Sequence, residues 1–168
     1  MPKHDRTTIK LRMKMKLRTL AAILVLGLGL TTPMMAGDAI SEALVKAAEK
    51  KVPSISSKAL QQMIDDGDEF IGLDVREEHM REEGTFDVEE DFKIARGVLE
   101  FDISAAIPNK KALVIVYCRA GKSAALAAST MKEQLGYSNV KYLEGGLDEW
   151  LEEGHSIYNH FGEMVLAK

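Results

Sequence analysis

Apolar and polar positions along the chain predict strands that alternate with helices. Nearly continuous apolar runs at residues 69–75 and 112–117 indicate buried strands in a sheet that is covered on both faces. A third strand is predicted within "NVKYLEGG", residues 139–146. Helical spacing is found at residues 57–66 and 123–135. This alternation favours a mostly parallel α/β sheet, in which functional sites form beyond the carboxyl ends of the strands.

Local signals place the ends of these helices. Ser56 or Ser57 fits the N-cap of the first helix, and Gly67 its end. Gly136 fits the end of the second helix.

The remaining segments carry weaker patterns. Residues 38–51 predict a short amphipathic helix, and four apolar side chains share one of its faces: Ile40, Leu44, Val45 and Ala48. The charged stretch 76–84 predicts a short helix, and Leu147–Glu153 a helical turn. Residues 85–103 combine an acidic loop with a short predicted strand around Val98–Phe101. No element is assigned to the tail that begins at His155.

Charge divides the chain into two unlike parts. Residues 1–36 contain seven Lys and Arg against a single acid, Asp5, which is a net charge of +6. The whole chain carries a formal charge of −4, so the remaining 132 residues carry −10. A domain this acidic disfavours nucleic acid as a partner, because nucleic-acid binding depends on neutralising phosphates.

The basic N-terminal part has the plan of a secretory signal peptide, residues 1–36. Its basic start is followed by an apolar core, Leu20–Leu30, and then by small and polar residues. Cleavage after Ala36 and cleavage after Ala39 both fit. The core is shorter than the roughly 20 apolar residues of a spanning helix, and a membrane anchor at residues 20–30 is the alternative. We expect export, to the periplasm of a Gram-negative bacterium, with membrane contact only through an uncleaved leader.

The only cysteine, Cys118, lies between a predicted strand and a predicted helix. A lone cysteine in an exported protein suggests a reactive thiol or an intermolecular bridge. In the loop "CRAGKS", Gly121 lets successive amides curl around an anion, and Arg119 and Lys122 supply positive charge. A helix N-terminus and nearby cations lower the pKa of a thiol. The loop therefore predicts an accessible, ionised sulfur, and a buried structural cysteine is the alternative.

Four separated motifs resemble the single-domain rhodaneses, in the same order. They are "LDVREE" at 73–78, "ARGVLEF" at 95–101, "CRAGKSAALAAS" at 118–129 and "YLEGGLDEW" at 142–150, the second being typical of one rhodanese subgroup. The resemblance implies a rhodanese-like α/β fold, an open parallel sheet of about five strands with helices on both faces. It also implies a sulfurtransferase that holds sulfane sulfur as a persulfide on the loop cysteine. The predicted domains are a helical extension at 37–52, the rhodanese domain at 53–156 and a tail at 157–168.

The resemblance also assigns candidate site residues. Cys118 matches the catalytic cysteine, and the loop around the persulfide corresponds to Arg119, Ala120, Gly121, Lys122 and Ser123. Supporting positions are Asp74 and Arg76, a mainly structural pair, and Arg96, a basic residue of one subgroup. The motif with Gly145, Gly146 and Trp150 is structural in the family. Many rhodaneses have a basic residue where this chain has Ser123, so one substrate-facing cation is missing.

The family implies small partners and no metal or organic cofactor. The expected donor is a small sulfur-containing anion, thiosulfate or polysulfide, and the acceptor is a thiol, cyanide or a protein thiol. A non-catalytic sulfur carrier or partner-binding module is the alternative. A phosphatase of related fold is disfavoured, because its longer loop ends in Arg, whereas Ser123 and Ala124 follow Lys122 here. The histidines have no signature spacing to Cys118, and no cluster has the spacing of metal ligands.

Overall fold

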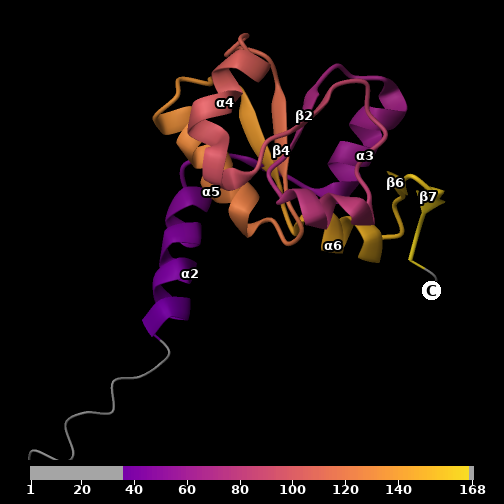
Figure 1. Ribbon diagram of the computed structural model, residues 1–168, viewed down its shortest axis with the longest axis horizontal. Coiled ribbons are helices and arrows are strands. Elements are labelled where there is room, and N and C mark those ends of the chain that lie inside the picture. The colour runs from indigo at the N-terminus through magenta and orange to yellow at the C-terminus, as the bar shows by residue number, and fades with distance from the viewer. Residues whose placement is uncertain (1–35, 167–168) are drawn as a thin grey trace, which may run out of the picture. The chain divides into compact units, whose positions relative to one another are not determined.

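The computed structural model describes residues 36–166 (Figure 1). Its elements are, in chain order, α2 (Ala36–Glu49), β1 (Ser54–Ile55), α3 (Ser57–Asp66), β2 (Ile71–Asp74), the 3-10 helix η1 (Glu78–Glu83), β3 (Asp91–Lys93), the 3-10 helix η2 (Arg96–Val98), α4 (Leu99–Ala106), β4 (Val114–Tyr117), α5 (Lys122–Glu133), β5 (Val140–Leu143), α6 (Gly146–Glu152), β6 (Ile157–Asn159) and β7 (Gly162–Met164). Apart from Ala36, the predicted leader and the alternative anchor at 20–30 lie outside the described residues. Within the described range, no helix has the length and apolar character needed to span a membrane.

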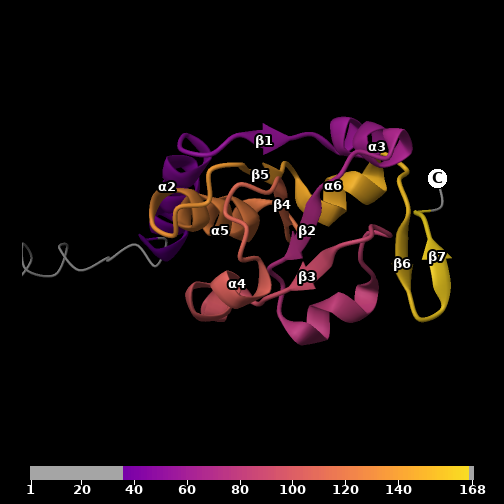
Figure 2. The same ribbon diagram turned by 90° about the horizontal axis from the view of Figure 1, so that it is seen from above.

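Five strands form one parallel sheet in the order β1-β5-β4-β2-β3. Figure 2 shows the strands in this order, with α4 and α5 on one side of the sheet and α3 and α6 on the other. The central strand β4 pairs with β2 on one side and β5 on the other. The predicted α/β architecture with about five parallel strands is therefore confirmed.

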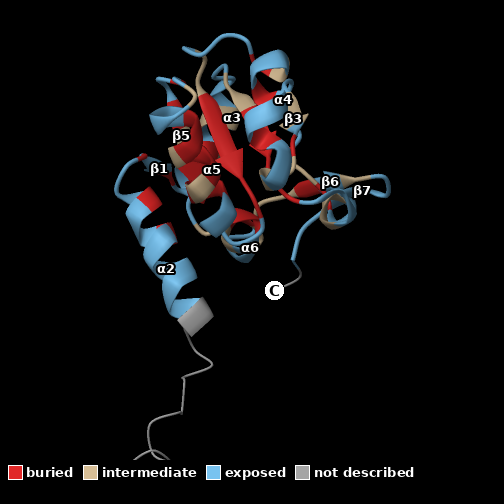
Figure 3. Ribbon diagram, turned by 60° about the vertical axis from the view of Figure 1, so that its left-hand side comes forward, coloured by how far each residue is buried: buried red, intermediate tan, exposed pale blue. Residues whose placement is uncertain are grey.

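Alternate residues of β4 build two separate cores. Val114 and Val116 belong to the cluster under α4 and α5, and Cys118 continues this series just beyond the strand. Ile115 and Tyr117 belong to the cluster under α3 and α6. Side chains of a strand alternate between faces, so the position of Cys118 in the register directs its thiol toward α5. The central strands and the inner faces of the helices are buried (Figure 3).

Small side chains allow α5 to lie close to the sheet. Four alanines of this helix are completely buried: Ala124, Ala125, Ala127 and Ala128. A helix with such a face can approach the strands more closely than one with large side chains. The N-terminus of α5 is thereby held directly beside the end of β4.

The predicted strand around Val98–Phe101 is wrong. These residues form η2 and the first turns of α4. Leu99 and Ile103 are completely buried while Phe101 is 81% exposed, which is helical rather than alternating spacing. The strand found within residues 85–103 is β3, which lies in the part predicted as an acidic loop.

Three further segments are better defined by the structure than by the sequence pattern. The amphipathic helix at 38–51 is found as α2, but only Val45 and Ala48 of its four predicted apolar positions are buried. Ile40 and Leu44 are exposed. The unassigned tail forms an antiparallel hairpin of β6 and β7, in which Tyr158 also bridges to Thr85. Ser56 caps α3, because its hydroxyl accepts a hydrogen bond from the Ala59 amide.

Candidate active site

Cys118 and the Asp74–Arg76 pair lie at the same edge of the sheet. Asp74 ends β2, Tyr117 ends β4, and the two residues are paired in register. The Val75 amide donates a hydrogen bond to the Tyr117 carbonyl oxygen, which continues the pairing past both strand ends. Parallel strands bring their carboxyl ends together, so the two candidate segments identified in the sequence meet here.

The loop after β4 surrounds the Cys118 sulfur with backbone amides. Gly121, the N-cap of α5, adopts a left-handed φ of +76°, which turns the chain from the end of β4 into the helix. The Ala124 amide nitrogen lies 3.4 Å from Sγ and donates to it. A sulfur anion in this position faces N–H groups at the positive end of α5 that have no partner within the helix.

The thiol is less accessible than the sequence predicted. Cys118 is only 6% exposed and belongs to the core cluster beneath α5. Burial raises the pKa of the Cys118 thiol above its usual value, because a charged sulfur loses hydration. Hydrogen bonds from backbone amides, chiefly that of Ala124, act against this increase. The prediction of an accessible sulfur with a lowered pKa is therefore wrong, although the predicted amide donors are in place.

The glycines before α6 hold the loop from the other side. A Cβ on Gly146 would lie 2.5 Å from the carbonyl oxygens of both Cys118 and Arg119. The amides of Leu147 and Asp148 donate to these same two oxygens, at 3.0 and 2.9 Å. The "GG" motif is thus required for a close backbone approach that fixes the loop carbonyls while its amides face the sulfur.

Asp74 and Arg76 form a buried ion pair that organises the chain after β2. The guanidinium of Arg76 contacts the carboxylate of Asp74 at 2.6 Å, and both side chains are almost completely buried. Arg76 also donates to the carbonyl oxygens of Met80 and Gly84, at 3.1 and 2.7 Å. One buried cation therefore ties the middle of η1 and the residue that follows it to the end of β2. This agrees with the mainly structural role that the resemblance implies for the pair.

Arg119 is held by two carboxylates instead of standing free at the loop. Its Nη1 lies 3.3 Å from Oε1 of Glu83, and its Nε lies 3.2 Å from Oδ1 of Asp148. Neither carboxylate was recognised from the sequence, because they come from segments 36 and 29 residues away. The other loop residues Ala120, Lys122 and Ser123 are exposed. The ammonium group of Lys122 has no ion pair among the described residues.

Arg96 does not join the loop. Its side chain donates to Glu100 at 2.8 Å and to the hydroxyl of Thr130, on α5, at 3.1 Å. Its amide donates to the Val75 carbonyl oxygen. These contacts connect α4 with α5 behind the site, so Arg96 has a structural place rather than one that faces the sulfur.

A second polar pair, Tyr117 and the partly buried Asp91, lies on the face of the sheet opposite the Cys118 thiol. The hydroxyl of Tyr117 donates to the carboxylate of Asp91, with oxygen distances of 2.9 and 2.8 Å. Burial raises the pKa of Asp91 to about 6. Gly72 leaves room for this carboxylate, since a Cβ there would lie 2.6 Å from Oδ1 of Asp91. No pattern in the sequence indicates this pair, because its residues are 26 positions apart and meet only in the folded sheet.

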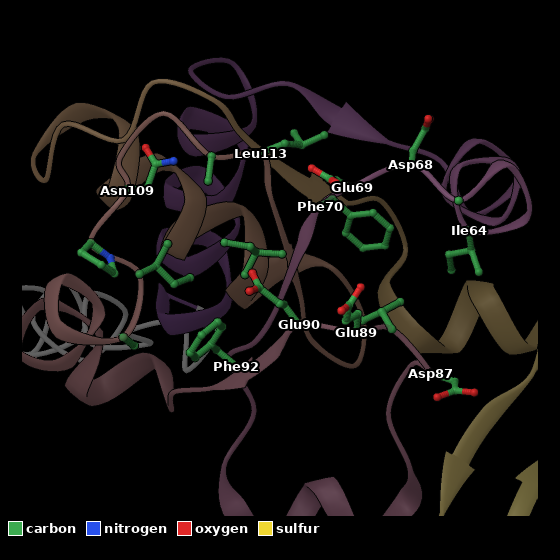
Figure 4. Close-up of a pocket in the computed structure, with 17 residues that line it drawn as sticks. Ile64, Asp68, Glu69, Phe70, Asp87, Glu89, Glu90, Phe92, Asn109 and Leu113 are labelled. Carbon is green, nitrogen blue, oxygen red and sulfur yellow. The ribbon is translucent and has the colours of Figure 1, made fainter.

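A cavity of about 820 Å³ lies away from the thiol (Figure 4). Its walls come from the ends of α3 and α4 and from the segments that precede β2, β3 and β4. Apolar side chains such as Phe70 and Phe92 line it, together with the carboxylates of Asp68, Glu69, Asp87, Glu89 and Glu90. It therefore opens at the amino ends of the strands, opposite the edge that carries Cys118.

The described residues contain no close group of three His, Cys, Asp or Glu side chains that could hold a metal ion. Within the same residues no histidine hydrogen-bonds Cys118, and His155 packs instead against the ring of Trp150 at 4.5 Å.

Comparison with protein families identifies the chain. The model of the rhodanese-like domain matches residues 56–153, which is more than half of the sequence. The chain belongs to the rhodanese family. A comparison of this rhodanese with curated proteins found no significant match.

Solved structures share the fold. The chain is similar to the 30 kDa polysulfide-sulfur transferase homodimer from Wolinella succinogenes, with 28% identity, a TM-score of 0.61, and coverage of 79% of this chain and 92% of that one. It is similar in fold to thiosulfate sulfurtransferase from Pseudomonas aeruginosa, with 19% identity, a TM-score of 0.59, and coverage of 76% and 24%. A protein of unknown function from Rhodopseudomonas palustris, described as a possible tyrosine phosphatase, has 24% identity, a TM-score of 0.61, and coverage of 70% and 92%. A sulfurtransferase-like fold is thus established.

Proposed function

We propose that this rhodanese is an exported sulfurtransferase that moves sulfane sulfur from thiosulfate or polysulfide to a thiophilic acceptor through a persulfide on Cys118. One observation carries the proposal: the only thiol of the chain lies inside a loop whose amides point toward its sulfur, with Ala124 N at 3.4 Å. The similarity to a polysulfide-sulfur transferase supports polysulfide as a donor. The basic and apolar leader supports export.

In the first half-reaction, the Cys118 thiolate attacks the outer sulfur of the donor. A bond forms between Sγ and that sulfur, the sulfur–sulfur bond of thiosulfate breaks, and its electron pair leaves with sulfite. The loop amides of Ala120, Gly121, Ser123 and Ala124 provide fixed donors for the negative charge that remains on the persulfide. These donors need no reorganisation during the step, because Gly121 and the α6 amides already fix the loop.

In the second half-reaction, a thiol or cyanide attacks the outer sulfur of the persulfide. The bond between that sulfur and Sγ breaks, and the electron pair returns to Cys118 as a thiolate. Two separate transfers through one covalent intermediate predict ping-pong kinetics.

A sulfur carrier or partner-binding module is the second candidate. The burial of Cys118 and the pairing of Arg119 with two carboxylates favour it, because both reduce the access of a small free anion to the sulfur. A carrier would accept sulfur readily from polysulfide and turn over thiosulfate slowly.

Intact mass of the mature protein tests the proposal. The protein is measured before and after incubation with thiosulfate or with polysulfide, beside the Cys118→Ser variant. A gain of one sulfur atom that cyanide reverses, and that is absent from the variant, is the expected result. Gain with polysulfide alone would favour the carrier. Gain with neither donor would contradict sulfur transfer and leave a binding module.

A further inference from the structure

Glu83 lies between two arginines, Arg76 and Arg119, the second of which belongs to the Cys118 loop. Its Oε1 lies 3.3 Å from Nη1 of Arg119, and its Oε2 lies 3.8 Å from Nη1 of Arg76. Arg76 is buried and already paired with Asp74, whereas the side chain of Arg119 is 55% exposed. The carboxylate of Glu83 therefore connects the buried cation Arg76 with the exposed cation of the loop, Arg119.

The backbone around Glu83 is held in place by Arg76. The carbonyl oxygens of Met80 and Gly84, on either side of Glu83, both accept hydrogen bonds from the Arg76 guanidinium. Arg81 adds a hydrogen bond from its own guanidinium to the Arg76 carbonyl oxygen, at 2.6 Å. The backbone around Glu83 is therefore anchored beside Arg119, whereas the carboxylate itself is 50% exposed.

The charges near Arg119 leave this residue little capacity for another anion. Glu83 and Asp148 both contact its guanidinium, so the three side chains together carry a net charge of −1. A dianion that binds through Arg119 must displace at least one carboxylate and leave it close to the other one. The exposure of all three groups keeps each pair weak enough for such displacement.

We propose that Glu83 is a specificity-determining residue, which competes with anionic sulfur donors for Arg119 and so weakens the binding of small dianions such as thiosulfate. This inference rests on the proposed function, because it assigns Arg119 to donor recognition. It predicts that the loop binds a free dianion weakly although Arg119 directly follows Cys118 in the chain. An uncharged acceptor such as 2-mercaptoethanol does not need Arg119, so its use is independent of Glu83.

Calorimetric binding of thiosulfate to the mature protein tests this inference without turnover. Cys118→Ser is the background, and Glu83→Gln is compared with Glu82→Gln. Glu82 is the matched control, because it is the exposed neighbour in η1, the substitution removes the same charge, and it has no ion pair among the described residues. The Kd for thiosulfate should fall about two- to fivefold with Glu83→Gln, the range expected for loss of one exposed ion pair. It should change little with Glu82→Gln.

The same pair of substitutions is then made in an Arg119→Gln background. In that background, Glu83→Gln and Glu82→Gln should have the same Kd for thiosulfate, because no Arg119 guanidinium remains for Glu83 to occupy. Equal Kd values for Glu83→Gln and Glu82→Gln in the first background would overturn the inference. A full effect of Glu83→Gln without Arg119 would also overturn it, since the effect would then be a general change of charge.

Steady-state kinetics of the active chain separate this inference from the proposed function. With Cys118 intact, Glu83→Gln should lower the KM for thiosulfate two- to fivefold while kcat and the KM for 2-mercaptoethanol stay unchanged. Absence of any persulfide in the wild-type protein would remove the proposed function. The calorimetric comparison would still show whether Glu83 controls anion binding at Arg119.

Discussion

Gly146→Ala is expected to disrupt the loop of Cys118 from outside it. Gly146 has a left-handed φ of +64°, which costs an L-residue roughly 1–2 kcal/mol. The new Cβ would also lie 2.5 Å from two backbone oxygens, those of Cys118 and Arg119, and 2.6 Å from the Gly121 nitrogen. Backbone atoms cannot rotate away, so the loop must shift, and overpacking of this kind typically costs about 1–3 kcal/mol. The free energy of unfolding should therefore fall by about 2–5 kcal/mol in total.

Gly146→Ala is also expected to slow sulfur loading, because the loop that shifts carries the reacting sulfur of Cys118. A shift of roughly 1 Å in a positioned reacting group can cost about 100-fold in rate. Sulfur loading of Cys118, followed by intact mass over time, should slow by at least about tenfold by that reasoning.

Gly67→Ala is the matched control for backbone strain. Gly67 has a similar φ of +72°, but a Cβ there would meet no atom within 4 Å. Urea denaturation should show a loss of only roughly 1–2 kcal/mol for this variant, and sulfur loading should be normal. If Gly146→Ala costs no more than Gly67→Ala and loads sulfur at the wild-type rate, the close approach of the two loops does not support the site.

Two predictions concern pH. Burial raises the pKa of Asp91 from 3.8 to about 6, so Asp91 stabilises the fold below its unfolded pKa and this contribution is lost as pH rises toward 6. Urea denaturation should therefore show Asp91→Asn gaining stability relative to wild type between pH 4 and 7, by at most about 3 kcal/mol. Asp87→Asn, an exposed control, should not show this gain, and an equal gain in both variants would refute the role of burial. Burial also raises the pKa of Cys118 above its ordinary value, so the rate of alkylation by iodoacetamide should rise over a more alkaline range than that of an exposed cysteine in a peptide. A rate that reaches its plateau below pH 8 would contradict this.

The chemistry of the site was predictable where it depends on neighbours in the sequence. The apolar run that ends at Tyr117, the glycine at 121 and the alanines of α5 together define a strand, a turn and a helix start. Any chain that folds this segment as strand–loop–helix brings the Cys118 sulfur near the first amides of the helix. The location of the candidate site is therefore a local property.

The environment of the thiol was not predictable in the same way. Cys118 shares its core cluster with Leu99 and Ile103, which come from a helix that the residue pattern did not predict. Helix α4 was missed because it is short and its buried positions are only four residues apart, within a stretch that also suits a strand. Desolvation is the sum of many distant contacts, so the direction of the Cys118 pKa shift follows from packing and not from the loop.

The partners of the charged residues were decided by tertiary structure as well. The sequence determined that Arg76 and Arg119 exist near strand ends, that Gly121 and Gly146 allow tight turns, and that a lone cysteine occupies the central loop. Only the fold determined that Glu83 and Asp148 meet Arg119, because these residues come from separate elements that the sheet brings to one edge. Local periodicity fixes which face or turn a residue occupies, whereas pairing across the sheet depends on strand order, which the residue pattern alone does not encode.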